Sequence, residues 1–142
     1  MSRPTKDHVE LLATVPLFST IPRKHLKALA TQFEVRMGEE GTVLTTQGEY
    51  GREFFAVVSG TARCEVDGAE VRTLAAGDFF GELALLAGGP RNATITVTSD
   101  MELLVCDRSD FTAMLRAAPE VAIKMLRDLA HRLQVADVRV TN

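Results

Sequence analysis

The chain lacks tryptophan, has only two cysteines and contains no long hydrophobic run. Cys64 and Cys106 are too few for a disulfide framework and do not form a metal motif, so we expect both to be small buried residues. No apolar run is long enough to span a bilayer, and no charged-then-apolar signal segment opens the chain. We therefore expect a cytoplasmic protein without a membrane partner.

Basic residues are also in short supply. The chain carries 16 lysines and arginines against 19 aspartates and glutamates, and its net charge is -3. Because a domain that binds nucleic acid through phosphates normally has a basic face, we expect no direct binding to DNA or RNA. The three histidines, His8, His25 and His131, lie far apart and lack metal-ligand spacing. We expect no metal site and no enzyme, since no nucleophile, base and orienting group converge.

The length and composition fit one domain over residues 1–142. The chain has 142 residues, of which 46% are hydrophobic. Helical patterns occupy residues 1–32 and 108–142, and the segment 33–107 alternates short apolar runs with turn signals about every 8 to 12 residues. The predicted class is α+β: an antiparallel β-roll or jelly roll (a double-stranded β-helix) with N-terminal helices, a short internal helix and two C-terminal helices.

Several short runs in the middle segment are typical of strands. They are EVRM, TVLTTQG, EFFAVVSG, TARCEV, AEVRTL, ATITVTS and ELLVCD. Asp67 and Gly68 stand between TARCEV and AEVRTL, which predicts a two-residue hairpin turn. The stretch GELALLAGG interrupts the strands, and its helix-favouring residues between glycines predict the short internal helix.

Two helices are predicted after the roll. Ser109 and Asp110 are candidate caps for the first helix, and Pro119 ends it. The second helix is amphipathic, and its apolar face can either pack on the roll or pair with a second copy of the chain. The residues of that face are Val121, Met125, Leu129, Leu133 and Ala136.

One arginine is predicted to point into the roll. After Pro90 the sequence alternates, so that Ala93, Ile95 and Val97 share one face of a strand. Arg91 has the same parity and therefore faces the core, where an unpaired guanidinium costs several kcal/mol. Its natural partners are a carboxylate or a phosphate, because both match its planar fork.

The predicted helix start at Gly81 is a second anion-binding feature. If Gly81 caps the helix, the free amides of Glu82, Leu83 and Ala84 line its N-terminus and form an anion site. Glu82 is itself negative and fits better as an acceptor for sugar hydroxyls. An alternative remains open, because Glu82 is favourable in a first helical turn through the dipole alone, and Arg91 can pair with it in an empty fold.

The stretch FGELALLAGGPRNATITV resembles the phosphate-binding cassette of the cyclic nucleotide-binding domain family. In that family, Gly-Glu and an apolar helical turn precede an arginine and small residues that open a strand. The resemblance spans roughly residues 15–136 and includes PLFSTIP, TQGEYGREFFAVVSGTARC, CDRSDFTAML and LAHRLQ. It places the cassette at residues 79–94.

The resemblance implies a site for a cyclic nucleotide. Arg91 would bind an exocyclic oxygen of the cyclic phosphate, and Glu82 would accept the ribose 2′-hydroxyl. Backbone amides would complete the phosphate cradle, and Arg132 on the last helix would bridge to Glu82. The implied ligand-binding residues are Phe80, Gly81, Glu82, Leu83, Ala84, Arg91, Asn92, Ala93 and Arg132.

The resemblance favours cAMP over cGMP as the ligand. Asn92 keeps cGMP open, because its side-chain oxygen can accept a hydrogen bond from a guanine amine. Since no tryptophan can stack on the base, aliphatic residues of the last helix such as Leu133, Val135 or Val138 would cover it if that helix folds over.

The implied function is that of a sensor without catalysis or cofactor. Ligand entry would reorganise the cassette, draw the C-terminal helices toward the roll and change the affinity for a partner. That partner would be a second copy of the chain or an effector protein. The alternative is a ligand-free β-roll that acts as an interaction or dimerisation module, although retention of both Glu82 and Arg91 argues against it.

Overall fold

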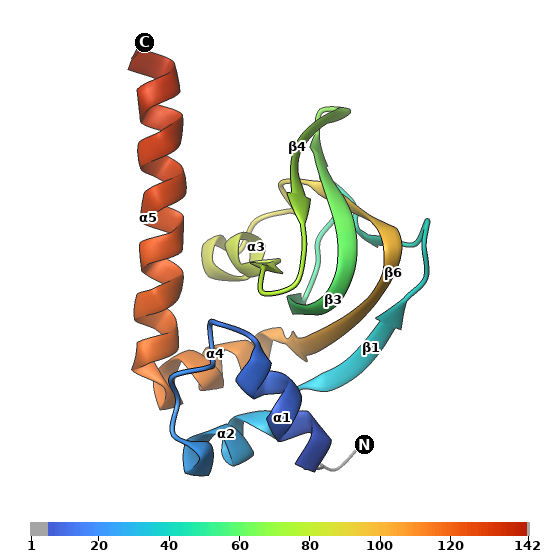
Figure 1. Cartoon of the computed structure of the whole chain (residues 1–142). Coiled ribbons are helices and arrows are strands. Elements are labelled where there is room, and N and C mark those ends of the chain that lie inside the picture. Colours follow the sequence, from blue (N-terminus) through green and yellow to red (C-terminus); the bar gives the residue numbers. More distant parts are fainter. Residues whose placement is uncertain (1–5, 142) are drawn as a thin grey trace.

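The computed structural model describes residues 6–141, with side chains described for residues 8–135. Two helices precede the strands, a short helix lies between the last two strands, and two helices follow (Figure 1). The helices are α1 (Lys6–Thr14), α2 (Arg23–Ala30), α3 (Glu82–Ala87), α4 (Arg108–Ala117) and α5 (Pro119–Thr141). The strands are β1 (Glu34–Gly38), β2 (Val43–Thr45), β3 (Glu53–Val66), β4 (Ala69–Leu74), β5 (Phe79–Phe80) and β6 (Thr94–Asp107).

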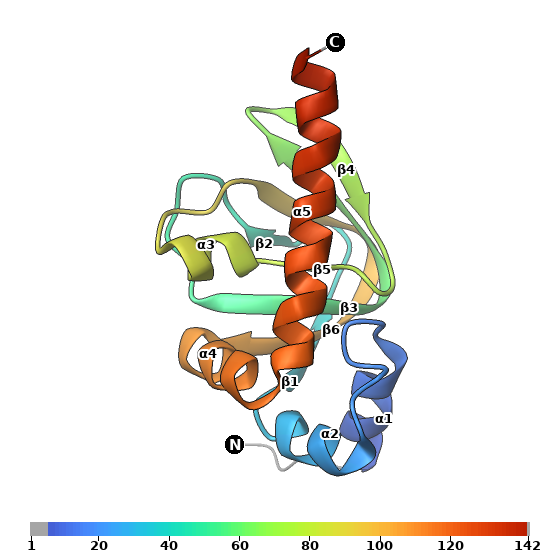
Figure 2. The same cartoon turned by 90° about the vertical axis from the view of Figure 1, so that its left-hand side faces the viewer.

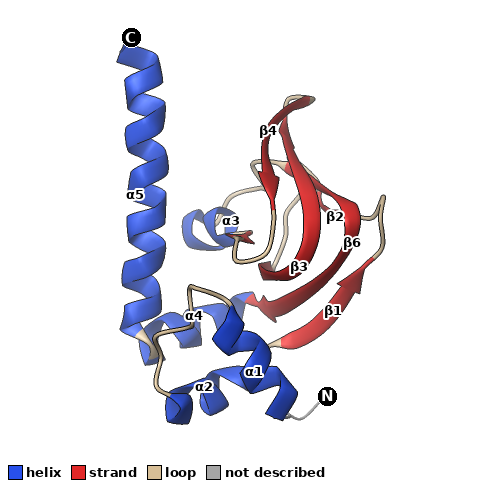
Figure 3. Ribbon diagram, viewed as in Figure 1, coloured by secondary structure: helices blue, strands red, loops and turns tan. Residues whose placement is uncertain are grey.

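The strands form an antiparallel sheet that is centred on β6 and β3. The order is β1-β6-β3-β4, with β2 paired to β6 and β5 paired to β3. Figure 3 shows the strands curling around one side of the molecule, with α1, α2 and α4 at one end of the curl and α5 beside it. The predicted α+β class with an antiparallel roll is confirmed. The assignment of the whole chain to one domain stays a prediction.

The two central strands are longer than the short strands predicted. EFFAVVSG and TARCEV form one strand of 14 residues, and ATITVTS and ELLVCD form another of 14 residues. The separation of EFFAVVSG from TARCEV after Gly60 is therefore wrong: Gly60 lies within β3, has a φ of 85° and stands where the β3–β6 register shifts. A Cβ there would lie 2.2 Å from the carbonyl oxygen of Asp100. Glycine thus allows a bulge that bends both strands while they stay paired.

The hairpin predicted between β3 and β4 is confirmed. Asp67 has a φ of 53° and Gly68 a φ of 81°, both positive as a type I′ turn requires. The Gln47 side chain donates to Asp67 Oδ1 at 2.9 Å and accepts from the Asp67 backbone amide at 2.8 Å. These two bonds tie the loop between β2 and β3 to the tip of the hairpin.

The central sheet separates two hydrophobic interiors. In β3, Phe54 and Ala56 face an interior that is shared with α1, α2, α4 and α5, whereas Phe55 and Val57 face the inside of the roll. This alternation follows from the pleat of a strand, which sends successive side chains to opposite faces. The helices therefore cover the outer face of the sheet, and the inner face is left to line the roll.

The cap predicted for α4 is corrected by the structure. The N-cap is Asp107, the last residue of β6, and its carboxylate accepts from the Asp110 amide at 2.9 Å. Ser109 lies within the first turn and donates to the same carboxylate. Because β6 runs directly into α4, the capping residue was concealed at the end of a strand-like stretch.

Among the side chains of α5 that the structure describes, the buried ones lie in the first half of the helix. Val121 and Met125 are buried, and Leu129 is partly buried against the helix-side interior. Leu133 is 65% exposed, so the described part of the predicted apolar face divides between packing on the chain's own fold and facing solvent. The side chain of Ala136 lies outside the described residues. Figure 2 shows α5 in front of the roll with α3 next to it. Within residues 6–141, no helix combines the length and apolar content needed to cross a bilayer.

Candidate functional site

A cavity of about 210 Å³ lies inside the roll, next to α3 and α5. The nine residues that the resemblance implied for ligand binding all line this cavity. The segment around α3 contributes most of them, and Arg132 joins from α5. The lining consists of Thr45, Cys64, Val66, Arg72, Leu74, Phe80, Gly81, Glu82, Leu83, Ala84, Arg91, Asn92, Ala93, Ile95 and Arg132.

Gly81 joins β5 to α3 at the cavity wall. Its φ of 93° lies in the left-handed region, which favours glycine. A Cβ at this position would lie 2.7 Å from the carbonyl oxygen of Glu53 and 2.9 Å from Arg91 Nη1. The absence of a side chain therefore lets the first turn of α3 lie against β3 and against the arginine.

Arg91 is buried beside this turn and has no carboxylate paired with it. Its exposed fraction is 7%, in agreement with the inward direction predicted from strand parity. Nη1 donates to Gly81 O at 3.0 Å, and Nη2 donates to Glu53 O at 2.8 Å. Burial lowers the pKa of Arg91, although the charges of Glu53 and Glu82 act in the opposite direction. Among residues 8–135, none of the ion pairs includes Arg91, so the alternative pairing with Glu82 is not formed.

The backbone of Arg91 is held by a neighbouring loop. Because β6 begins at Thr94, Arg91 does not open the strand as predicted. Instead the Gly48 amide donates to Arg91 O at 2.9 Å, and the Arg91 amide donates to Glu49 O at 2.8 Å. The arginine is therefore fixed through its backbone by the β2–β3 loop and through its side chain by two carbonyl groups.

Glu82 is buried with one carboxylate oxygen unpartnered. It is 2% exposed, and its Oε2 accepts from the Leu83 amide at 3.1 Å. Oε1 has no hydrogen-bond partner. Burial raises the pKa of Glu82, while the charge of Arg132 works against that rise. The amides of the first turn are thus not all free as predicted, because the Glu82 side chain occupies that of Leu83.

Arg132 connects α5 to the cavity. Its Nη2 lies 3.7 Å from Glu82 Oε1 and 2.5 Å from Asp128 Oδ2. Its guanidinium lies 5.7 Å from the centre of the Phe79 ring. At 3.7 Å the contact with Glu82 is an ion pair that is too long for a hydrogen bond. Arg132 and Glu82 are therefore paired as predicted, but by an ion pair without a hydrogen bond.

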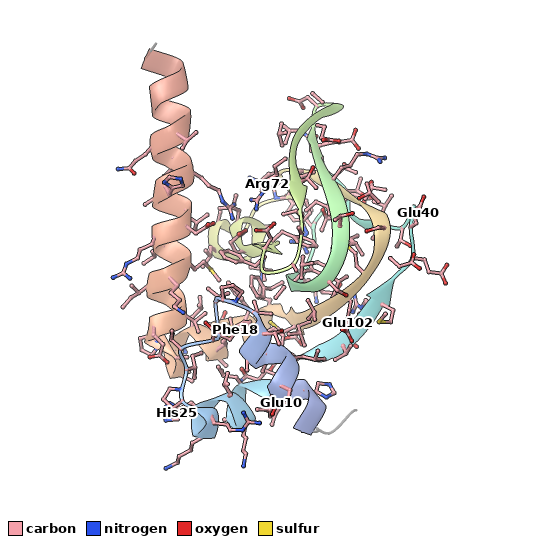
Figure 4. All side chains as sticks on the ribbon, in the orientation of Figure 1. Glu10, Phe18, His25, Glu40, Arg72 and Glu102 are labelled. Atoms are coloured by element: carbon pink, nitrogen blue, oxygen red, sulfur yellow. The ribbon has the colours of Figure 1, made fainter. Side chains whose placement is uncertain are left out.

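Sequence reasoning missed the residues that β2, β3, β4 and β6 contribute to the cavity. The missed residues are Thr45, Cys64, Val66, Arg72, Leu74 and Ile95. Strand alternation was the available signal, because residues two apart on β3 or β4 point to the same side. Arg72 is the charged member of this group, and its Nη2 lies 3.7 Å from Asp78 Oδ1. Figure 4 shows Arg72 on the side of β4 nearest α3.

In this structure the described aliphatic residues at the end of the last helix do not cover the cavity, and their predicted cover of a bound base stays a prediction. Leu133 is 65% exposed, Val135 is 39% exposed, and neither lines the cavity. The side chain of Val138 lies outside the described residues. Asn92 is exposed at the cavity rim.

Comparison with known sequences identifies related proteins. The sequence profile of the cyclic nucleotide-binding domain matches residues 36–118. A cyclic nucleotide-gated potassium channel of Rhizobium etli is 34% identical over 113 residues, which cover 80% of this chain and 32% of the channel. The cyclic AMP receptor protein of Thermus thermophilus is 34% identical over 130 residues, which cover 88% of this chain and 60% of that protein.

Comparison with solved structures extends the likeness to the helices. The cAMP-bound structure of PfPKA-R superposes with a TM-score of 0.83 at 26% identity, covering 93% of this chain and 46% of that chain. The present chain spans less than two thirds of the length of these three relatives.

Proposed function

The chain belongs to the cyclic nucleotide-binding domain family, and we propose that it is a sensor that binds cAMP in the cavity of the roll. In this proposal the nucleotide is a regulatory ligand, and the domain carries out no catalytic step and requires no cofactor. The names of two relatives support the choice of cAMP: the cyclic AMP receptor protein and cAMP-bound PfPKA-R.

The observation that carries the proposal is the buried and unpaired charge of Arg91. A guanidinium that has left water needs a negative partner, and both hydrogen bonds of this one go to neutral carbonyl groups. A cyclic phosphate would supply that charge in a geometry that suits the guanidinium fork. A neutral ligand would leave the buried charge of Arg91 without a negative partner.

The environment of Glu82 supports a sugar fused to that phosphate. Oε1 is a buried acceptor without a donor, and it belongs to a residue that lines the same cavity as Arg91. A ribose 2′-hydroxyl is a donor of the right kind, because a hydrogen bond to a charged acceptor is among the stronger ones. Backbone amides near Ala84 and Asn92, with Phe80 and Ala93 as wall residues, would complete the proposed site.

We propose that α5 reports whether the site is occupied. Arg132 on this helix shares Glu82 with the proposed ribose, so ligand binding would alter the ion pair that links the helix to the cavity. A receiver that prefers one position of α5 would then respond to the ligand, and would in return change its affinity. The receiver would be a second copy of the chain or an effector protein. Direct nucleic-acid binding is not proposed, because the net charge is -3.

Calorimetry with cAMP, cGMP and 5′-AMP tests the proposal. We expect cAMP to bind most tightly and 5′-AMP most weakly, because the linear nucleotide does not present the fused ring. Arg91→Ala should weaken cAMP binding by about 2–5 kcal/mol. Arg63→Ala is a matched control, since this arginine pairs with Glu65 and does not line the cavity.

Two outcomes would count against the proposal. A wild-type chain that binds no cyclic nucleotide would refute the sensor and favour the ligand-free interaction module. A wild-type chain that binds cAMP with an affinity that Arg91→Ala leaves unchanged would refute the site and leave the function standing.

A further inference from the structure

We propose that Gly51, in the loop between β2 and β3, positions Arg91 for ligand binding, an inference that rests on the proposed function. Gly51 lies outside residues 79–94 and does not line the cavity. Its contribution is the absence of a side chain beside the guanidinium. A Cβ at Gly51 would lie 2.1 Å from Nε of Arg91, 2.5 Å from Cζ and 2.5 Å from Nη2. These distances are far shorter than any that real Cβ atoms show, so only glycine is compatible with this position of the arginine.

Two glycines approach the guanidinium closely, and we call the space that Gly51 and Gly81 leave for it the glycine slot. A Cβ at Gly51 would meet Nε, Cζ and Nη2 of Arg91, and a Cβ at Gly81 would lie 2.9 Å from Nη1. The slot directs the two terminal nitrogens onto Gly81 O at 3.0 Å and Glu53 O at 2.8 Å. The direction of the guanidinium is therefore set by the close approach of the Gly51 and Gly81 backbones and by hydrogen bonds to the carbonyl groups of Gly81 and Glu53.

The loop between β2 and β3 is anchored through its backbone and through Gln47. The Gly48 amide and the Glu49 carbonyl exchange hydrogen bonds with the backbone of Arg91. Gln47 is bonded in both directions to Asp67 at the hairpin tip. The guanidinium, by contrast, is the end of a flexible side chain. A methyl group at position 51 would therefore displace the guanidinium and leave the loop in place.

The backbone of Gly51 does not itself require glycine. Gly51 is absent from the residues with positive φ, so alanine can adopt its conformation without strain. Gly68 shows the opposite case, because its φ is 81° and a Cβ there would meet nothing within 4 Å. The two glycines therefore separate a side-chain effect on Arg91 from a backbone effect on stability.

The experiment compares Gly51→Ala with Gly68→Ala by cAMP calorimetry and thermal unfolding of the full chain. We expect Gly51→Ala to weaken cAMP binding at least about tenfold while its Tm stays near that of the wild type. Gly68→Ala should lower the Tm and keep the wild-type affinity. In the ligand-free protein, the Arg91 Nε–H signal in NMR spectra should exchange faster with water in Gly51→Ala and stay unchanged in Gly68→Ala.

A double mutant tests whether Gly51 acts through Arg91. In an Arg91→Ala background the added Gly51→Ala change should cause almost no further loss, because the group that it displaces is gone. An equal loss in both backgrounds would overturn the inference, as would wild-type affinity in Gly51→Ala, or a Tm of Gly51→Ala below that of Gly68→Ala. If the wild type itself fails to bind cAMP, the proposed function fails and the inference falls with it.

Discussion

Replacing Glu82 with glutamine is expected to move stability and affinity in opposite directions. The change preserves the shape of the side chain and removes its charge. In the ligand-free protein the carboxylate is 2% exposed, its Oε1 has no hydrogen-bond donor, and Arg132 lies 3.7 Å away. Glutamine should therefore stabilise the ligand-free fold, while it weakens a nucleotide that donates a hydroxyl to this position.

The size of both effects follows from the surroundings of the carboxylate. Burial disfavours the charged form of Glu82, and the ion pair with Arg132 offsets part of that cost. Glutamine keeps a buried polar group in the same place, so it removes only the part of the cost that comes from the charge. We expect a net gain of about 1 kcal/mol at neutral pH, which corresponds to a rise in Tm of about 2–4 °C for a domain of this size. The loss of a charged acceptor should weaken cAMP binding by about 1–2 kcal/mol, or roughly 5- to 30-fold.

The stability gain should depend on pH in a defined direction. Burial raises the pKa of Glu82 above its ordinary value of 4.5, so the folded state holds this proton more tightly than the unfolded state does. The contribution of the carboxyl group to stability is then full below 4.5 and is lost as the pH rises through the folded-state pKa. The advantage of glutamine should accordingly be largest at neutral pH and shrink as the solution is acidified toward 4.5.

Thermal unfolding from neutral pH downward, together with calorimetry using cAMP and 2′-deoxy-cAMP, measures both effects. Glu70→Gln is the matched control, because Glu70 is exposed on β4 and should show neither change. A lower Tm for Glu82→Gln at neutral pH would refute the reasoning about burial. An undiminished preference for ribose over deoxyribose would remove Glu82 from the proposed sugar site.

Further substitutions test the bulge, the cap and the helix link. Gly60→Ala should lower the free energy of unfolding by about 2 kcal/mol or more, because its Cβ would lie 2.2 Å from Asp100 O. A urea titration that shows a change below about 0.5 kcal/mol would contradict that close approach. Asp107→Ala should destabilise by about 1 kcal/mol through loss of the α4 cap, and Ser109→Ala much less; equal losses in urea would place the cap elsewhere. Arg132→Ala should speed amide hydrogen exchange in the second half of α5, because it breaks the ion pair to the cavity; unaltered exchange would show that the pair does not hold the helix.

Arg91 is buried as predicted, but strand parity is not the cause, because the residue lies before the start of β6 at Thr94. Parity is a local rule that acts within a strand, and it correctly placed Ile95 and Val97 in the interior at 5% and 1% exposure. The glycine at the start of α3 was predictable for a similar reason, because a chain that changes direction into a helix needs a residue that tolerates positive φ.

The rest of the site depends on contacts between distant segments, which leave no local signal. The carbonyl of Glu53 that accepts from Arg91 lies 38 residues away in sequence, and the pairing of β4 with β3 brings Arg72 to the cavity. At Gly60 the local signal was present but ambiguous, because a turn and a bulge both favour glycine. The position of α5 was ambiguous in the same way, since its apolar face can pack either on the chain's own roll or against a second copy of the chain.

Phe54 and Phe55 are neighbours in the chain, yet they belong to interiors on opposite sides of one sheet. The sheet is therefore apolar on both faces, and the helices cover one of these faces. A fragment trimmed to residues 33–107 would lack the helices and would expose the helix-side apolar face of the sheet to water. Such a fragment would be expected to aggregate or lose its shape, so ligand measurements require the helices at both ends.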